Sequence, residues 1–225
     1  CVPQILGPVA ETIDNTAETV EREMNSANDN PIISMEDENV FHGGNFHGDY
    51  IAFEMDKLKL AITKMTMLAE RQLNFLMNDK LNERFPPFLN AGVLGLNYGL
   101  QGMVFSATST TAESQALCTS LYIHSIPCNN DNQDIVSMGA NAARVAEHVI
   151  ENSAQVMSLL LLALAQAADF DGLKDKLSPA SKDIYRQIRS VADRVEADKP
   201  ISHQLKALKD LISNEERFSD LDLNL

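Results

Sequence analysis

The sequence has few of the residues that interrupt helices. Ten glycines and eight prolines occur in 225 residues, and they gather in a handful of short regions. Two long stretches, residues 49–84 and 140–171, contain neither residue type. This scarcity favours helices over sheets, because strands need frequent turn residues between them. A hydrophobic content of 44% is ample for one sizeable core, or for one large helical layer of a bigger assembly.

Other absences exclude whole classes of protein. No run of lysines or arginines occurs, and the net charge of −14 argues against nucleic-acid binding. The three cysteines, Cys1, Cys118 and Cys128, form no C-x-x-C pair, so a reducing cytoplasm is expected rather than secretion. No run of 18 apolar residues and no signal peptide is visible, so no membrane association is predicted. The sequence also lacks a G-x-S-x-G elbow, a P-loop and a G-x-G-x-x-G motif.

One long amphipathic helix is predicted at residues 49–84. Asp49 is a suitable N-cap, and Phe85-Pro86-Pro87 is predicted to end the helix. The apolar residues recur at alternating steps of three and four, which places them on a single face: Ile51, Met55, Leu58, Ile62, Met65, Ala69, Leu73 and Leu76.

Further helices complete an all-α fold dominated by long bundle helices. They are predicted at residues 9–27, 97–118 and 140–171, in a helix that starts at Ser178-Pro179 and ends at Pro200, and in a short helix through Leu205, Leu208 and Leu211. Residues 32–48 are expected to be extended or looped. We expect residues 1–170 to form the bundle with its loops, and residues 171–225 to form an appended helical tail.

Three polar segments stand out against this helical background: residues 25–31, 43–48 and 129–134. They concentrate carboxamides, carboxylates, glycines and a proline. Polar loops are costly to keep inside a helical protein unless their side chains are used. The three segments therefore predict an active site built from hydrogen-bonding groups rather than from a metal or a nucleophile.

The first and third segments also have ordinary structural interpretations. On local features alone, residues 25–31 are best explained by a helix end with an Asx turn, and the functional alternative is that Asn30 presents its amide to a cavity. Residues 129–134 are explained by a capped helix start. The functional alternative uses that same helix N-terminus to hold a carboxylate ligand among the carboxamides of the segment.

The second segment allows several interpretations. His42, His47 and Asp49 carry metal-ligating atoms, but their spacing matches no established zinc pattern, so no metal is predicted. Gly43-Gly44 is expected to allow a close backbone approach. Phe46 is either a core anchor for the loop or an aromatic face against a bound planar group.

Taken together, these segments resemble the aromatic amino acid ammonia-lyase family, which includes histidine, phenylalanine and tyrosine ammonia-lyases and related aminomutases. The resemblance covers about residues 1–170 and is specific, because several motifs occur in the same order. It implies the all-α histidine ammonia-lyase-like fold, a homotetramer and sites shared between subunits. The stretches that carry it are Asn25-Ser26-Ala27-Asn28-Asp29-Asn30-Pro31, Gly43-Gly44-Asn45-Phe46-His47-Gly48, Phe85-Pro86-Pro87-Phe88-Leu89 and Asn132-Gln133-Asp134-Ile135-Val136-Ser137-Met138-Gly139.

The resemblance also implies a prosthetic group. The family uses an electrophilic 4-methylidene-imidazol-5-one, which forms from an internal Ala-Ser-Gly. No Ala-Ser-Gly occurs in these 225 residues. The family's catalytic Tyr-x-x-Arg segment is expected just before Cys1. The chain is therefore expected to be the C-terminal portion of such an enzyme, with an N-terminal portion missing and no activity of its own.

Two residues are implied to act at the reacting centre. Phe46 matches the aromatic residue that packs beside the electrophile. Gln133 stands where histidine lyases carry glutamate and where phenylalanine and tyrosine lyases carry glutamine. A carboxylate accepts hydrogen bonds as an anion, whereas a carboxamide is neutral and also donates. The resemblance therefore favours tyrosine or phenylalanine as the substrate, with histidine as the alternative.

Four further residues are implied to bind the substrate. Asn30 matches the asparagine near the prosthetic group and the substrate carboxylate, and Asn129 and Asn132 match positions of the substrate-binding loop. Gln101 stands where plant phenylalanine lyases have lysine.

The leading hypothesis is thus that the chain is part of a cytoplasmic lyase, which eliminates ammonia from an aromatic amino acid to give the α,β-unsaturated acid. A tyrosine 2,3-aminomutase would use the same residues but return the amine to the β-carbon. A hypothesis of another class is a helical assembly module without activity.

Overall fold

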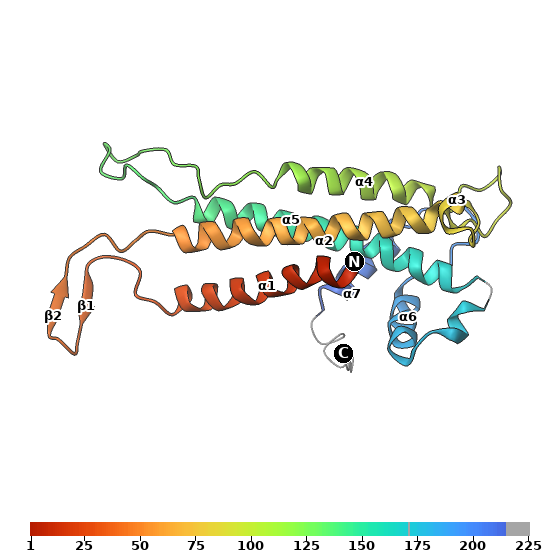
Figure 1. Ribbon diagram of the computed structural model, residues 1–225, viewed down its shortest axis with the longest axis horizontal. Helices are drawn as coiled ribbons and strands as arrows, with labels where there is room; N and C mark the ends of the chain where they lie inside the picture. Colours follow the sequence, from red (N-terminus) through yellow and green to blue (C-terminus); the bar gives the residue numbers. More distant parts are fainter. Residues whose placement is uncertain (171, 215–225) are drawn as a thin grey trace. The chain divides into compact units, whose positions relative to one another are not determined.

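The computed structural model describes residues 1–170 and 172–214. Over this range the chain is predominantly helical, which confirms the predicted all-α class (Figure 1). The elements are α1 (Val2–Met24), β1 (Ile32–Ser34), β2 (Asn39–Phe41), α2 (Asp49–Met77), α3 (Asp79–Asn82), η1 (Pro87–Leu89), α4 (Gln101–Ala116), α5 (Gly139–Ala168), η2 (Leu173–Lys176), α6 (Pro179–Val191) and α7 (Ser202–Ile212).

The chain divides into two compact units. The first combines Cys1–Met65 with Gln115–Ile150, and the second combines Thr66–Ser114 with Glu151–Leu225. Each of the long helices α2 and α5 has one part in the first unit and its other part in the second unit. The proposed division at residue 170 stays a prediction, and residue 171 and residues 215–225 of that tail lie outside the described residues.

Several helix ends differ from the predicted ones. α1 begins at Val2 and carries Pro8 within it, so it starts earlier than residue 9 and ends at Met24. α4 and α5 follow the predicted ranges closely. Ser178 caps α6 as predicted, its hydroxyl accepting from the Ser181 N–H at 3.2 Å, but α6 ends at Val191 rather than at Pro200.

The predicted helix at residues 49–84 is interrupted by two asparagines. α2 ends at Met77, because the Asn78 side chain accepts a hydrogen bond from the Lys80 N–H and caps the short α3. Asn82 then donates to the Asn78 carbonyl at 2.7 Å and accepts from the N–H of Phe85 at 2.8 Å. These side-chain bonds satisfy the main-chain groups that a helix end leaves open.

The second unit has the larger hydrophobic core. Gln166 is fully buried within it, and its amide donates to the carbonyls of Val195 and Leu89 at 2.8 and 3.3 Å while its oxygen accepts from the Val195 N–H at 3.1 Å. A buried amide with all these partners specifies one arrangement of the chain segments that meet there. Buried apolar residues of this core include Leu73, Leu89, Leu100, Met103, Val156, Leu159, Leu162, Ile188, Leu208 and Leu211.

α5 has the composition of a buried helix. Among the described residues it is the one helix that is long and apolar enough to cross a membrane, judged by length and hydropathy alone. Of its most apolar 18-residue segment, 56% is buried within the fold. Core helices of soluble proteins pass the same test, so this helix carries little weight as a membrane segment.

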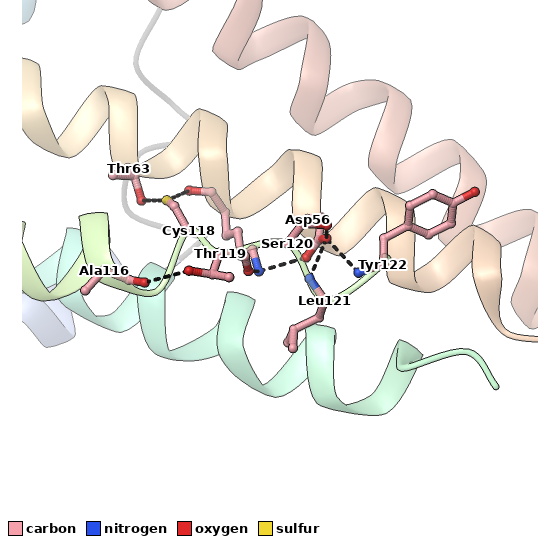
Figure 2. Close-up of polar contacts among 9 residues, drawn as sticks. Asp56, Thr63, Ala116, Cys118, Thr119, Ser120, Leu121 and Tyr122 are labelled. Carbon is pink, nitrogen blue, oxygen red and sulfur yellow. Dashed lines mark hydrogen bonds and ion pairs between the residues drawn. The ribbon is translucent and has the colours of Figure 1, made fainter. Parts of the chain in front are cut away.

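The first unit contains a buried ion pair that fastens the chain after α4 to α2 (Figure 2). The Lys59 ammonium is fully buried and lies 2.7 Å from Asp56 Oδ1. It also donates to the Thr119 carbonyl at 2.7 Å. Asp56 Oδ2 accepts from the Ser120 hydroxyl at 2.7 Å and from the N–H groups of Leu121 and Tyr122 at 2.9 Å each.

Burial alone raises the pKa of the Asp56 carboxyl. The hydrogen bonds from Lys59, from Ser120 and from the Tyr122 N–H, together with the Lys59 charge, outweigh that effect and hold the pKa below its ordinary value of 3.8. The folded state therefore favours the carboxylate form of Asp56. Its partners anchor residues 119–122, which lead into the loop that carries Gln133.

We expect Asp56→Asn to lower the free energy of unfolding by about 3 kcal/mol at neutral pH, because it leaves the buried Lys59 ammonium without its carboxylate. The folded pKa lies below the unfolded one. The stabilisation is therefore complete above the ordinary pKa of 3.8, which the unfolded chain has, and is lost as pH falls through the folded pKa. Urea unfolding over a pH series should show the difference between wild type and variant shrinking at acidic pH.

Asp183→Asn is the matched control, because Asp183 pairs with Arg186 at 2.6 Å on the exposed surface. Exposed pairs of this kind contribute about 0–1 kcal/mol. Equal effects of the two substitutions, or a pH-independent effect of Asp56→Asn, would contradict the assigned anchoring by Asp56.

Candidate functional site

The three polar segments all belong to the first unit and lie in the loops between its helices. Residues 25–31 follow α1, residues 43–48 precede α2, and the third segment, taken here with its flanking residues as 128–138, leads into α5. Figure 1 shows these three helix ends on the same side of the unit. Because these helix ends lie on one side, the three loops attached to them occupy a common region of the unit.

Hydrogen bonds join the three segments to one another. The Asn45 side chain donates to the Ala27 carbonyl at 2.7 Å, which connects the first segment to the second. The Gly48 N–H donates to the Ser137 hydroxyl at 3.0 Å, and His47 Nε2 lies 3.0 Å from the Ile135 carbonyl oxygen. These two contacts connect the second segment to the third, so the segments form one hydrogen-bonded group.

Two glycines permit this arrangement. A Cβ on Gly48 would lie 3.1 Å from the Ser137 hydroxyl, and a Cβ on Gly139 would lie 3.0 Å from the Gly48 carbonyl oxygen. The sequence had suggested Gly43-Gly44 for this purpose, but a Cβ at either position meets no described atom within 4 Å. Within the described residues the close contact is made instead where α2 and α5 begin, and the expectation for Gly43-Gly44 stays a prediction.

Phe46 and Gln133 line one hollow of about 200 Å³. The other lining residues are His47, Ile135, Val136 and Ser137. The Phe46 residue is 47% exposed, so its ring is not buried in the core of this chain. The choice between a core anchor and a contact with a bound group in the assembled enzyme stays a prediction.

The loop that carries Gln133 is a closed turn rather than a helix start. The N–H of Cys128 donates to the Gln133 carbonyl at 3.0 Å, and the N–H of Gln133 donates to the Cys128 carbonyl at 3.4 Å. Asn129, Asn130 and Asp131 have φ of 54°, 54° and 60°, a left-handed conformation that Asn and Asp tolerate best among residues with a side chain. The prediction that this segment sits at a helix N-terminus is wrong, since α5 begins only at Gly139.

The remaining predicted residues lie outside the hollow's lining. Asn129 and Asn132 are exposed on the turn, where the Asn132 N–H donates to the Asn129 carbonyl at 3.2 Å. Asn30 is exposed in the first segment, and its N–H donates to Asp29 Oδ1 at 2.8 Å. Gln101 is the first residue of α4 and belongs to the second unit. Their roles in substrate binding stay predictions.

Two side chains gain a role that the sequence did not assign. His47 contacts Asp49 at 3.0 Å as well as the Ile135 carbonyl, so it links the second segment to the third. Among the residues that the structure describes, no group of three or more His, Cys, Asp or Glu side chains could hold a metal ion.

Cys128 donates from Sγ to Gln133 Oε1 at 3.1 Å. The Asn-Asn-Asp run between these two residues is a turn signal, although Asn and Asp also favour helix caps.

Comparison with known proteins agrees with the family suggested by the motifs. The sequence model of the aromatic amino acid lyase family matches residues 1–190. The tyrosine ammonia-lyase of Cupriavidus metallidurans is 42% identical over 212 residues, which cover 94% of this chain and 40% of that enzyme. The MIO-dependent tyrosine 2,3-aminomutase of Streptomyces globisporus is 39% identical over 215 residues, covering 96% of this chain and 40% of that enzyme.

Solved structures extend this agreement to the fold. The phenylalanine aminomutase of Pantoea agglomerans matches with a TM-score of 0.90 at 40% identity, covering 94% of this chain and 41% of that one. Histidine ammonia-lyases are also among the relatives and the solved structures, which confirms the predicted histidine ammonia-lyase-like fold. The chain spans about 40% of the length of the curated relatives that it matches. With its first 190 residues matched by the family model, the chain belongs to the aromatic amino acid lyase family.

Proposed function

We propose that this chain supplies part of the active site of an enzyme that eliminates ammonia from an aromatic amino acid and releases the α,β-unsaturated acid. The observation that carries the proposal is that Phe46 and Gln133, two residues singled out by family motifs, line one hollow. Three hydrogen-bonded loops build this part of the unit. Tyrosine or phenylalanine is the favoured substrate and histidine the alternative.

In this proposal the residues of the chain position the substrate. The carboxamides of Asn30, Asn129, Asn132 and Gln101 each offer two donors and one acceptor oxygen, which suits them to grip a carboxylate and an amine. Preorganised donors of this kind supply much of the rate enhancement in enzymes, because they need no reorganisation during the reaction. A base that removes the β-proton is expected outside these 225 residues.

The prosthetic group expected for the family is 4-methylidene-imidazol-5-one, and one relative is named as dependent on it. The group fits this chain in one respect, since the half-exposed Phe46 ring offers an aromatic face beside the hollow. The Ala-Ser-Gly that would form it does not occur in the chain. When bound, the group supplies an electrophile that makes the substrate amine a better leaving group.

A second candidate reaction is the 2,3-aminomutase reaction, which moves the amine from the α-carbon to the β-carbon, because aminomutases are among the most similar relatives. Both reactions begin with loss of the amine, and they differ in whether the amine returns to the β-carbon. The two reactions are distinguished by incubation with tyrosine. The enzyme used has the full length of the relatives and contains this chain. Free ammonia with an unsaturated acid supports the lyase, and a β-amino acid supports the mutase.

We further propose that the 225-residue chain alone is inactive and that the full-length enzyme is a cytoplasmic homotetramer with sites shared between subunits. The test compares the isolated chain with the full-length enzyme for oligomeric state, absorbance of the prosthetic group and turnover of tyrosine. Turnover by the isolated chain would contradict the proposal. A full-length protein that shows neither absorbance nor turnover would favour a helical assembly module.

Phe46→Ala in the full-length enzyme is expected to lower kcat by about tenfold to a hundredfold, because it removes the ring that helps to position the reacting groups. The free energy of unfolding should change by less than about 1 kcal/mol, since the ring is half exposed in this unit. Steady-state kinetics and urea unfolding measure the two quantities.

Phe41→Ala provides the control. Phe41 lies in β2 of the same unit and has the same exposed fraction as Phe46, 47%. It should leave kcat unchanged. A loss of folding without a specific loss of turnover in Phe46→Ala would favour the core-anchor interpretation in the assembled enzyme.

Gln133→Glu is expected to raise the ratio of kcat/KM for histidine to kcat/KM for tyrosine by about tenfold or more, because a carboxylate makes stronger hydrogen bonds to a cationic or imidazole partner. Asn130→Asp adds the same charge to the same turn at a residue that does not line the hollow. It should leave the ratio unchanged. An unaltered ratio in Gln133→Glu would remove the specificity role of this position.

A further inference from the structure

The turn at residues 128–133 holds its two end residues opposite each other. Two main-chain hydrogen bonds, of 3.0 and 3.4 Å, pair Cys128 with Gln133 in an antiparallel bridge. Three consecutive left-handed residues, 129–131, close the chain between them. Because directly opposed residues of an antiparallel pair project side chains on one side, the thiol and the carboxamide meet.

The thiol bonds to the oxygen of the carboxamide. Cys128 Sγ donates to Gln133 Oε1 at 3.1 Å. A glutamine side chain carries an acceptor oxygen on one side of its terminal carbon and an amino group with two donors on the other. With its oxygen turned towards Cys128, Gln133 has its amino group turned away from the thiol, where it can interact with a molecule in the hollow that the residue lines.

We propose that Cys128 is a positioning residue for specificity, which holds Gln133 with its amino group available as a hydrogen-bond donor in the hollow. This inference rests on the proposed function and deepens it. A donor suits a substrate group that accepts, such as a carboxylate or a phenol oxygen. A side chain free to turn over would also offer its oxygen, which suits the ring N–H of an imidazole. Cys128 therefore favours the carbocyclic amino acid over histidine.

The experiment uses the full-length enzyme with Cys128→Ala and Cys128→Ser, each in the wild-type and in the Gln133→Ala background. The quantity compared is the ratio of kcat/KM for the preferred aromatic amino acid to that for histidine. Cys128→Ala should lower this ratio by about twofold to threefold, the low end of the effect of losing one hydrogen bond, because a thiol is a weak donor. Cys128→Ser keeps a donor at the same position and should restore most of the ratio.

The Gln133→Ala background separates an orienting role from a merely structural one. If Cys128 acts through the carboxamide, Cys128→Ala has no further effect on the ratio once that carboxamide is gone. Cys1→Ala is the matched control, because Cys1 is also an exposed free thiol of the first unit. It should leave the ratio and the thermal midpoint unchanged.

An unchanged ratio in Cys128→Ala overturns the inference, as does an equal effect in both backgrounds or a failure of serine to restore the ratio. In each of these cases the enzyme is still active and the proposed function stands. A parent enzyme that turns over neither amino acid overturns the proposed function itself, and the inference falls with it.

Discussion

The contact between Gly48 and Gly139 fixes where α2 and α5 begin in the first unit. The Gly48 carbonyl accepts the Ala52 N–H at 3.0 Å, which starts α2, and the same carbonyl oxygen lies 3.0 Å from the position of a Cβ on Gly139. Any side chain at Gly139 would push the two helix starts apart. Overpacking of this kind typically costs about 1–3 kcal/mol. The same approach is accompanied by the hydrogen bonds of His47 to the Ile135 carbonyl and of the Gly48 N–H to Ser137, so the site loops lie beside this contact.

A second constraint is electrostatic. Asp56 and Lys59 are buried, and the carboxylate gathers three donors from residues 120–122 besides the ammonium. Charges removed from water are tolerated only when paired and hydrogen-bonded in this way. The exposed pair of Lys206 with Asp210, at 2.9 Å, contributes far less because water screens it. Among these charges, the buried pair therefore determines where the segment after α4 lies.

The long helices and the three polar segments could be predicted from the sequence, because periodicity and the positions of glycine and proline are local signals. The break at Asn78 could not, since no glycine or proline marks it and its cap forms only with the following N–H groups. Asn129 to Asp131 were ambiguous for a physical reason: Asn and Asp favour both helix caps and left-handed turns.

Contacts between distant segments could not be predicted from the sequence. Asp56 and Lys59, three residues apart, have the spacing of an ordinary surface pair on a helix. Only the fold buries them beneath residues 119–122. The close approach at Gly48 and Gly139 likewise depends on two loops separated by about ninety residues, so glycine-rich composition suggested the neighbouring Gly43-Gly44 instead.

The chain between α4 and α5 is held at both ends. Near α4 it is tied to Asp56 through residues 120–122, and near α5 it is tied to Gly48 through Ser137 and to His47 through Ile135. A span clamped at two points moves mainly in its middle. Local opening should therefore be concentrated between these ties, in residues 123–134, and can occur without loosening either helix.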